Sequence, residues 1–292
     1  MNGILVIDKD KNKTSRDIVN EVCHILHTKK VGHTGTLDPI ATGVLVLCIG
    51  EATKLVEVLT SLNKTYIATV ILGKETDTLD ITGITLKEEN INYNEQEIDT
   101  ILQSFLGIYE QEVPLYSAIK INGKKLYQYA REKKDISLPK REVTITKIER
   151  ITPLQKENGK IIFSFICEVS KGTYIRSLIR DIALKLNTIG CMQDLRRIRQ
   201  GTFEIKDAIK VSSLTENTTL LSISEALKTY PKEYIEGDFL FKIQNGNKIF
   251  NTYQKDYILF CTKQNIPIAL YKIDEKDKKL LKPWKMFKGG NI

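Results

Sequence analysis

The stretch GHTGTLDPIATGVL, from Gly32 to Leu45, joins a glycine-rich loop to an apolar segment. Asp38 directly precedes Pro39, and a residue before proline is pushed out of the helical region toward extended backbone. Gly35 adds backbone freedom just upstream. Two interpretations are open on these residues alone. Asp38 belongs either to an ordinary Asp-Pro turn or to a loop that presents a carboxylate as nucleophile or base.

The segments around this loop show strand and helix patterns in a mixed order. GILVID (3–8), KTYIATVILG (64–73) and KIIFSFICEVSKG (160–172) have the β-branched or apolar character of strands. A helix is predicted after Thr14, with another over 174–186. Because strands and helices do not alternate regularly, we predict an α+β fold with a mixed, largely antiparallel sheet rather than a doubly wound parallel sheet.

The composition is that of a globular chain. The 292 residues are 41% hydrophobic and 27% charged, which is enough apolar material for a large core. No apolar run approaches the roughly 18 residues that a membrane-spanning helix needs, and the first residues lack a signal-peptide pattern. We therefore expect a cytoplasmic protein without membrane contact. Five scattered cysteines without a C-x-x-C pair predict free thiols and no metal site.

Positive charge is concentrated toward the C-terminus. The chain carries a net charge of +8, and residues 240–292 hold eleven lysines against four acidic residues. Such a segment favours nucleic acid as a partner, with an anionic membrane as second choice, although a solvated lysine-rich face would look the same. The segment 228–238 is the best boundary candidate. We predict one domain over 1–230 and a small β-rich domain over 231–292.

Three further clusters hold side chains suited to RNA contact. SKGTYIRSLIRDI (170–182) places Tyr174 and Arg176 at a strand-to-helix corner, where an aromatic ring can stack on a base and an arginine can pair with a carboxylate or phosphate. Tyr66 opens the strand over 64–73. VPLYSAIKINGKKLYQYAREK (113–133) interleaves tyrosines with cations. On these residues alone, surface arginines, ordinary strand packing and a helix with mixed faces are open as alternative explanations of the three clusters.

The motifs of several other reaction classes are missing. The sequence contains neither a G-x-x-x-x-G-K-S/T phosphate loop nor a G-x-S-x-G nucleophile turn. All three histidines lie within the first 33 residues, which argues against a serine triad. A phosphoryl-transfer enzyme that uses Asp38 stays open as a hypothesis, and it would depend on magnesium.

Together, five blocks resemble the TruB-type tRNA pseudouridine synthases, in the order of that family, and they cover about residues 1–201. The blocks are GHTGTLDPIATGVLVLCIGEATKL, KTYIATVILGKETDTLDITG, VPLYSAIKINGKKLYQYARE, VSKGTYIRSLIRDI and DLRRIRQG. The C-terminal piece is similar, more weakly, to the small β-barrel PUA module of such enzymes. The chain departs from the family in KDKNKTS (9–15), which lacks the usual proline and glycine, and at Val113, where proline is common.

The resemblance implies the pseudouridine synthase fold and a defined reaction. The T-loop uridine of tRNA, position 55, would be isomerised without metal or organic cofactor: the glycosidic N–C bond breaks, the uracil turns, and a C–C bond forms. Asp38 stands in the place of the essential aspartate of the family. Attack on the sugar, attack on the base and removal of a sugar proton are all open to it.

The resemblance also implies roles in substrate binding, which requires the target base to leave its stack. Tyr66 would stack on the extruded base, and Arg176 would pair with Asp38. His33 would fill the space that the base leaves in the RNA loop. The positions that would line the uracil pocket are Tyr174 and Leu195.

The segment at about 115–141 corresponds by resemblance to an RNA-clasping insertion. Its presence favours the bacterial stand-alone type over relatives that depend on a guide RNA. We therefore expect a monomer that binds the T-arm of tRNA and needs no obligatory protein partner. The alternative from another class is an RNA-binding or tRNA-folding protein whose catalysis is secondary or lost.

Overall fold

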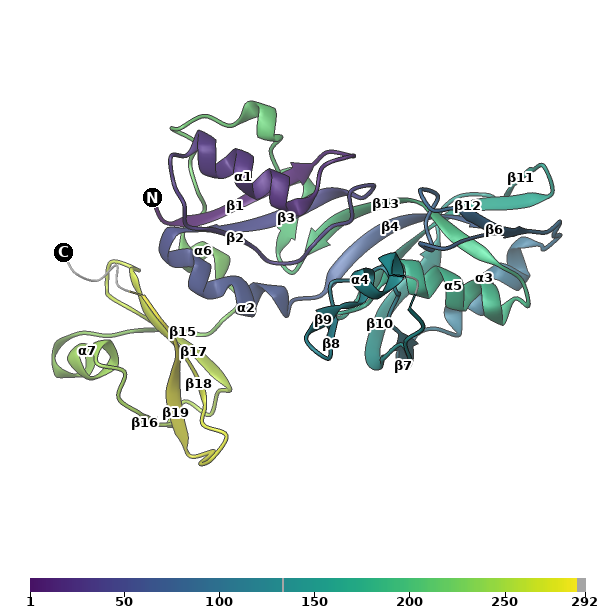
Figure 1. Cartoon of the computed structure of the whole chain (residues 1–292). Helices are drawn as coiled ribbons and strands as arrows, with labels where there is room; N and C mark the ends of the chain where they lie inside the picture. The colour runs from purple at the N-terminus through teal and green to yellow at the C-terminus, as the bar shows by residue number, and fades with distance from the viewer. Residues whose placement is uncertain (133, 288–292) are drawn as a thin grey trace.

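One long, twisted sheet carries the elements on both sides of the GHTGTLDP loop (Figure 1). The structure is a computed structural model that describes residues 1–132 and 134–287. The strands of the ten-stranded sheet are β1 (Gly3–Lys9), β2 (Val31–His33), β3 (Thr42–Ile49), β4 (Lys64–Leu72), β7 (Gly107–Glu112), β10 (Lys140–Arg150), β11 (Gln155–Glu157), β12 (Lys160–Val169), β13 (Gly190–Gln200) and β14 (Phe203–Glu204). Their order is β1-β3-β13-β4-β12-β10-β7, with β2 beside β3, β11 beside β12 and β14 beside β13.

The described strands of this sheet pair antiparallel except for β13 with β3. At that parallel junction Arg197 lies opposite Gly43, whose φ is +98°. A Cβ atom on Gly43 would stand 2.1 Å from the carbonyl oxygen of Arg197, so a larger residue would force the two strands apart. The predicted α+β fold with a mixed, largely antiparallel sheet is confirmed.

Helices cover the sheet and shape its edges. They are α1 (Ser15–Ile25), η1 (Gly50–Leu55), α2 (Val56–Thr60), α3 (Glu95–Gln103), α4 (Leu126–Arg131), α5 (Ile175–Lys185), η2 (Ile205–Asp207), η3 (Val211–Ser213), α6 (Ile223–Ala226) and α7 (Gly237–Gln244). The helix predicted after Thr14 is α1: Thr14 accepts from the backbone N–H of Asp17, and the Asp17 carboxylate accepts from that of Thr14. Its buried face, with Ile18 and Val22, joins the main hydrophobic core under the sheet.

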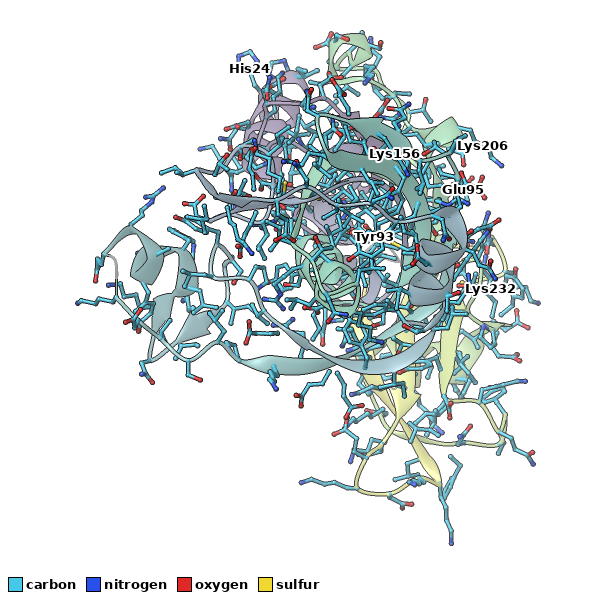
Figure 2. The ribbon with its side chains drawn as sticks, turned by 90° about the vertical axis from the view of Figure 1, so that its right-hand side faces the viewer. His24, Tyr93, Glu95, Lys156, Lys206 and Lys232 are labelled. Carbon is cyan, nitrogen blue, oxygen red and sulfur yellow. The ribbon has the colours of Figure 1, made fainter. Side chains whose placement is uncertain are left out.

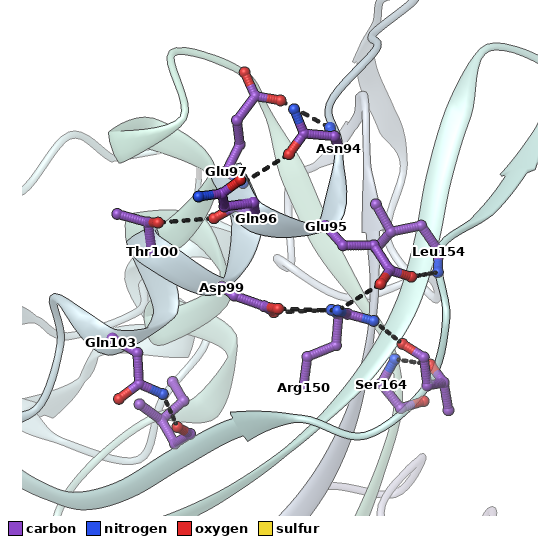
Figure 3. A network of polar contacts seen from close by, with 12 residues as sticks. Asn94, Glu95, Gln96, Glu97, Asp99, Thr100, Gln103, Arg150, Leu154 and Ser164 are labelled. Carbon is purple, nitrogen blue, oxygen red and sulfur yellow. Dashed lines mark hydrogen bonds and ion pairs between the residues drawn. The ribbon is translucent and has the colours of Figure 1, made fainter.

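A polar network ties α3 to β10 (Figure 3). Nε and Nη2 of Arg150 donate to the two carboxylate oxygens of Asp99 at 2.8 and 2.9 Å, and Nη2 also donates to Glu95 at 2.9 Å. Gln103 at the end of α3 donates to the carbonyl oxygen of Ile148 at 2.8 Å. Because both ends of α3 are held, the helix keeps a fixed position on the sheet.

Two small hairpins extend from the large sheet. They are β5 (Lys74–Thr76) with β6 (Thr85–Glu88), and β8 (Lys120–Ile121) with β9 (Lys124–Lys125). Turned by 90°, the molecule shows β8, β9 and α4 projecting away from its body (Figure 2). This projection lies within the segment 115–141, for which an RNA-clasping insertion stays a prediction from the family resemblance. One residue of that segment, Lys133, lies outside the described residues.

A separate five-stranded sheet follows toward the C-terminus. Its strands are β15 (Lys232–Tyr234), β16 (Ile249–Phe250), β17 (Tyr257–Cys261), β18 (Pro267–Ile273) and β19 (Leu280–Met286), in the order β15-β17-β18-β19-β16. The expected small β-rich C-terminal module is therefore present. The division at 230 and 231 stays a prediction, and residues 288–292 of the second domain lie outside the described residues.

The C-terminal sheet packs against the beginning of the chain. Leu259 and Leu270 share one buried apolar cluster with Val46 and Leu55. Lys232, which Figure 2 labels, donates to the hydroxyl of Ser224 at 2.6 Å and so ties β15 to α6. The two sheets therefore meet through buried apolar side chains, and a flexible linker is not what connects them.

Candidate active site

Four separate parts of the fold supply most of the lining of one cavity of about 370 Å³, which is large enough for a small ligand such as a nucleobase. They are the loop between β2 and β3, strand β4, the start of α5, and strand β13. The segment before β8 adds Tyr116 and Ser117 to the lining. The sequence-predicted site residues that line the cavity are Asp38, Tyr66, Tyr174, Arg176 and Leu195.

Asp38 is held at the cavity by Arg176. Nε of Arg176 lies 3.0 Å from Oδ2 of Asp38, and Nη2 donates to Oδ1 at 3.3 Å. The guanidinium also donates from Nη1 to the carbonyl oxygen of Thr78 at 2.9 Å and from Nη2 to that of Tyr116 at 3.1 Å. These contacts lock the planar group in place, so it orients a carboxylate that keeps 35% of its side-chain surface exposed.

A second carboxylate stands behind the same arginine. Oδ2 of buried Asp80 lies 4.0 Å from Nε of Arg176, and Asp80 accepts a hydrogen bond from the hydroxyl of Thr78 at 2.9 Å. Leu79, which lies between Thr78 and Asp80 in the sequence, has a φ of +62°, a backbone conformation that costs a non-glycine residue energy. Reasoning from the sequence missed Asp80. The run TDTLD (76–80), a few residues after β4, was the available signal.

Tyr174 is positioned through its backbone. It is the residue that precedes the first turn of α5, where its N–H donates to Oε1 of Gln111 at 2.8 Å. Nε2 of Gln111 returns a bond to the carbonyl oxygen of Tyr174 at 3.1 Å, so a single buried amide holds both backbone groups. The guanidinium carbon of Arg141 lies 5.5 Å from the centre of the tyrosine ring, a cation–π distance.

Tyr66 and Leu195 come from adjacent strands, β4 and β13. Both are largely buried but contribute to the cavity wall. His33 is different, because it lies at the end of β2 and is not part of the cavity lining. Burial, followed by the positive charges of Arg16 and Arg197, lowers the pKa of His33. Its Nδ1 is buried without a hydrogen-bond partner.

The described residues show neither a metal centre nor a membrane helix. Among residues 1–132 and 134–287, no three His, Cys, Asp or Glu side chains gather in a way that could hold a metal ion. Within the same part of the chain, no helix combines the length and apolarity needed to cross a membrane. The five cysteines are free, and burial raises the pKa of the Cys48 thiol to about 12.

Comparison with known protein families gives two matches along the chain. The model of the TruB family pseudouridylate synthase N-terminal domain matches residues 23–175, and that of the tRNA pseudouridylate synthase B C-terminal domain matches residues 176–235. The chain belongs to the TruB family of pseudouridylate synthases. As a member of this family it is an enzyme, an isomerase that makes pseudouridine.

Relatives of the TruB family match almost the entire chain. The tRNA pseudouridine synthase B of Bacillus pumilus is 40% identical over 301 residues, which cover 98% of this chain and 97% of that protein. The tRNA pseudouridine synthase B of Staphylococcus aureus is 39% identical over 302 residues, which cover 98% of this chain and 99% of the other. The predicted family is therefore confirmed.

Two solved structures show the same fold. One, described as an H/ACA ribonucleoprotein bound to a substrate RNA containing 2′-deoxyuridine, has a TM-score of 0.71 at 22% identity and covers 98% of this chain and 84% of that one. The other, an archaeal box H/ACA complex, has a TM-score of 0.68 at 22% identity, with 96% and 84% covered. At this identity the likeness concerns the fold.

Proposed function

We propose that this chain converts the T-loop uridine of tRNA, position 55, to pseudouridine, with Asp38 as the essential carboxylate. The observation that carries the proposal is the two-point contact between Asp38 and Arg176 at the wall of a cavity of nucleobase size. The tRNA substrate is supported by relatives named tRNA pseudouridine synthase B, which are about 40% identical over nearly the full chain.

The cavity suits a base that has left its stack. A nucleotide inside a folded RNA exposes neither its sugar nor its ring to a carboxylate, so it must be extruded before it reacts. Tyr66 offers an aromatic face for stacking, and Leu195 and Tyr174 supply further wall. In the reaction the C1′–N1 bond breaks and a C1′–C5 bond forms. The proton that leaves C5 is matched by the proton gained at N1, so no oxidant or second substrate is consumed.

The projecting segment before and within α4 supports RNA as the ligand. Nζ of Lys124 lies 4.9 Å from the ring centre of Tyr129, and Nζ of Lys125 lies 5.5 Å from that of Tyr127. Tyr127 also lines the cavity. Alternating rings and cations next to a reaction site can hold bases and phosphates of one strand together. We expect the chain to bind the T-arm as a cytoplasmic monomer, without an obligatory protein partner.

The test is to incubate the protein with an unmodified tRNA transcript and to map every pseudouridine by position. The wild type is expected to modify position 55 also in excess chelator, whereas a magnesium-dependent phosphoryl transfer would stop. Asp38→Asn, which keeps the size of the side chain, should abolish pseudouridine formation and change tRNA affinity less than about threefold. Asp238→Asn on exposed α7 is the matched control. Pseudouridine made by Asp38→Asn would refute the assigned role.

A further inference from the structure

The cavity that holds Asp38 contains two buried cations without a carboxylate partner. Lys64 begins β4, Arg197 lies on β13, and both line the cavity. Lys64 is 7% exposed and Arg197 is 1% exposed. Within residues 1–132 and 134–287, neither side chain forms a salt bridge, whereas Arg176 in the same cavity is paired with Asp38. Buried charges are normally paired, so this pair of cations needs an explanation.

Backbone carbonyl groups accept hydrogen bonds from both side chains but do not use all the N–H groups of either cation. Nζ of Lys64 donates to the carbonyl oxygens of Thr60 at 2.6 Å and Leu62 at 2.7 Å. Arg197 donates from Nε to Val44 at 2.6 Å and from Nη2 to Gly35 at 3.1 Å. Since an ammonium group has three N–H bonds and a guanidinium group five, each cation keeps at least one N–H beyond these contacts. The carbonyl groups orient the cations without neutralising them.

Both cations converge on Gly35 of the GHTGTLDP loop. A Cβ atom on Gly35 would lie 3.4 Å from Nη1 of Arg197 and 3.6 Å from Cε of Lys64. The φ of Gly35 is +152°, which side chains rarely allow. Glycine therefore leaves open the space between the loop backbone and the two positive groups, three residues before Asp38.

The electrostatic balance of this corner favours an anionic ligand. Burial, and then the positive charges of Arg197 and Lys171, lowers the pKa of Lys64 to about 8. A neutral uracil ring cannot compensate two positive charges, but the backbone of RNA brings one negative charge with every phosphodiester. Charge-assisted hydrogen bonds from Lys and Arg to phosphate oxygens are short and strong, and a desolvated site strengthens them.

We propose that Lys64 and Arg197 form a phosphate subsite that holds a phosphodiester next to the extruded uridine. This assignment rests on the proposed function, because it takes the uridine of an RNA as the occupant of the cavity. In this arrangement the base is held by the aromatic wall, and the backbone is held at Gly35. The phosphate contact would fix the sugar in front of Asp38.

The test combines a protein variant with a chemically altered RNA. T-arm stem-loops are made with one uncharged methylphosphonate, placed either 5′ or 3′ of the target uridine. In the wild type, one of these two RNAs should bind about tenfold more weakly than the unaltered RNA, as expected for the loss of one charge-assisted hydrogen bond. In Lys64→Gln the same methylphosphonate should cost clearly less than in the wild type, about threefold, because only Arg197 still contributes charge to the phosphate.

A second readout is the salt dependence of RNA binding. Lys64→Gln should reduce the magnitude of the slope of log affinity against log salt by about one, which corresponds to about one fewer ion released on binding. In steady-state kinetics the main effect should be a higher KM. Lys242→Gln, on the exposed face of α7, is the matched control and should keep the full methylphosphonate effect. If Lys64→Gln does not fold, Lys64→Met takes its place, because it removes the same charge while its apolar chain suits the buried position.

Two outcomes would overturn the phosphate subsite. One is that both methylphosphonate RNAs bind the wild type within twofold of the unaltered RNA. The other is that the methylphosphonate and Lys64→Gln effects simply add, which would show that the two groups do not interact. Failure of the proposed function is distinguishable from both, since wild-type protein would then form no pseudouridine on the unaltered RNA.

Discussion

Arg176 on α5 meets Asp38, which lies 138 residues earlier in the chain, through Nε at 3.0 Å from Oδ2 and Nη2 at 3.3 Å from Oδ1. The arginine is buried and the aspartate is partly open to the cavity. A planar guanidinium that contacts both oxygens fixes the plane of the carboxylate as well as its position. The helix α5 therefore aims the side chain that the loop before Pro39 presents.

Arg176→Lys should slow pseudouridine formation about 100-fold, because lysine keeps the charge but cannot contact both oxygens, and a shift of about 1 Å in a reacting group has effects of this size. Single-turnover rates on unmodified tRNA measure the change, and tRNA affinity should stay within about threefold. Arg180→Lys is the control on the same helix, where Arg180 pairs with Glu112 at 2.9 Å instead. A wild-type rate in Arg176→Lys would show that the orientation of Asp38 is unimportant.

Tyr66→Leu should weaken RNA binding by about tenfold, whereas Tyr66→Phe should bind like the wild type. Stacking of a base on an aromatic ring contributes about 1–3 kcal/mol, and phenylalanine keeps the ring. Dissociation constants for a T-arm stem-loop measure the effect. Because Tyr66 is largely buried, thermal unfolding of both variants is needed as a control. Equal affinities of the two variants would argue against stacking at this position.

Leu270→Ala should lower the free energy of unfolding by about 2–5 kcal/mol, the range for removing a large apolar side chain from a core. Leu270 on β18 is fully buried in the apolar cluster that joins the C-terminal sheet to Val46 and Leu55. Urea unfolding measures the change. Phe241→Ala, with a largely exposed ring on α7, should change stability by less than about 1 kcal/mol. Independent unfolding of the C-terminal module in the wild type would contradict the shared core.

The stability of the protein should depend on pH through Lys9. Lys9 is fully buried, and burial lowers its pKa from 10.5 to about 8, although the charges of Asp10 and Asp38 act in the opposite direction. Below pH 8 both the folded and the unfolded chain carry the proton, so the full penalty for burying the charge applies. Between about pH 8 and 10.5 the unfolded chain binds more protons, so the contribution of Lys9 to the free energy of unfolding rises with pH.

Lys9→Met tests this dependence. The difference in unfolding free energy between wild type and variant should shift in favour of the wild type as the pH rises from about 7.5 to about 9.5. The buried Lys9 ammonium donates to the carbonyl oxygens of Asp10 at 2.9 Å and Lys13 at 2.6 Å, so a constant offset from these lost bonds is expected as well. Lys242→Met on exposed α7 is the control. A difference that does not change with pH would contradict the assignment.

Local patterns were sufficient for much of the fold. The capping signal at Thr14, the apolar run before Gly50 and the strand patterns over 64–73 and 160–172 each correspond to an element of the structure. These signals are carried by neighbouring residues, because caps, turns and strand periodicity depend on local backbone geometry. The mixed order of the elements was enough to favour a largely antiparallel sheet.

The site was less accessible to local reasoning. Asp38 on its own fits an ordinary turn, and only the resemblance of five separated blocks to one family pointed to it as a reactive group. Asp80, Gln111 and Lys64 were missed, and Arg197 was recognised only as one of several arginines suited to a phosphate backbone. Gln111 and Arg197 act through partners that are distant in sequence: Gln111 and Tyr174 are 63 residues apart, and Arg197 and Gly35 are 162 residues apart.

The amino-acid sequence thus determined the elements, the fold class and the family, since these follow from local propensity, periodicity and the order of motifs. The tertiary structure decided which side chains meet. It placed Arg176 against Asp38, left His33 outside the cavity lining, and brought the buried cations Lys64 and Arg197 to Gly35. The physical reason is that a sheet joins strands by register and crossover, so distances between side chains of different strands are set by the folded backbone and have no local trace in the chain.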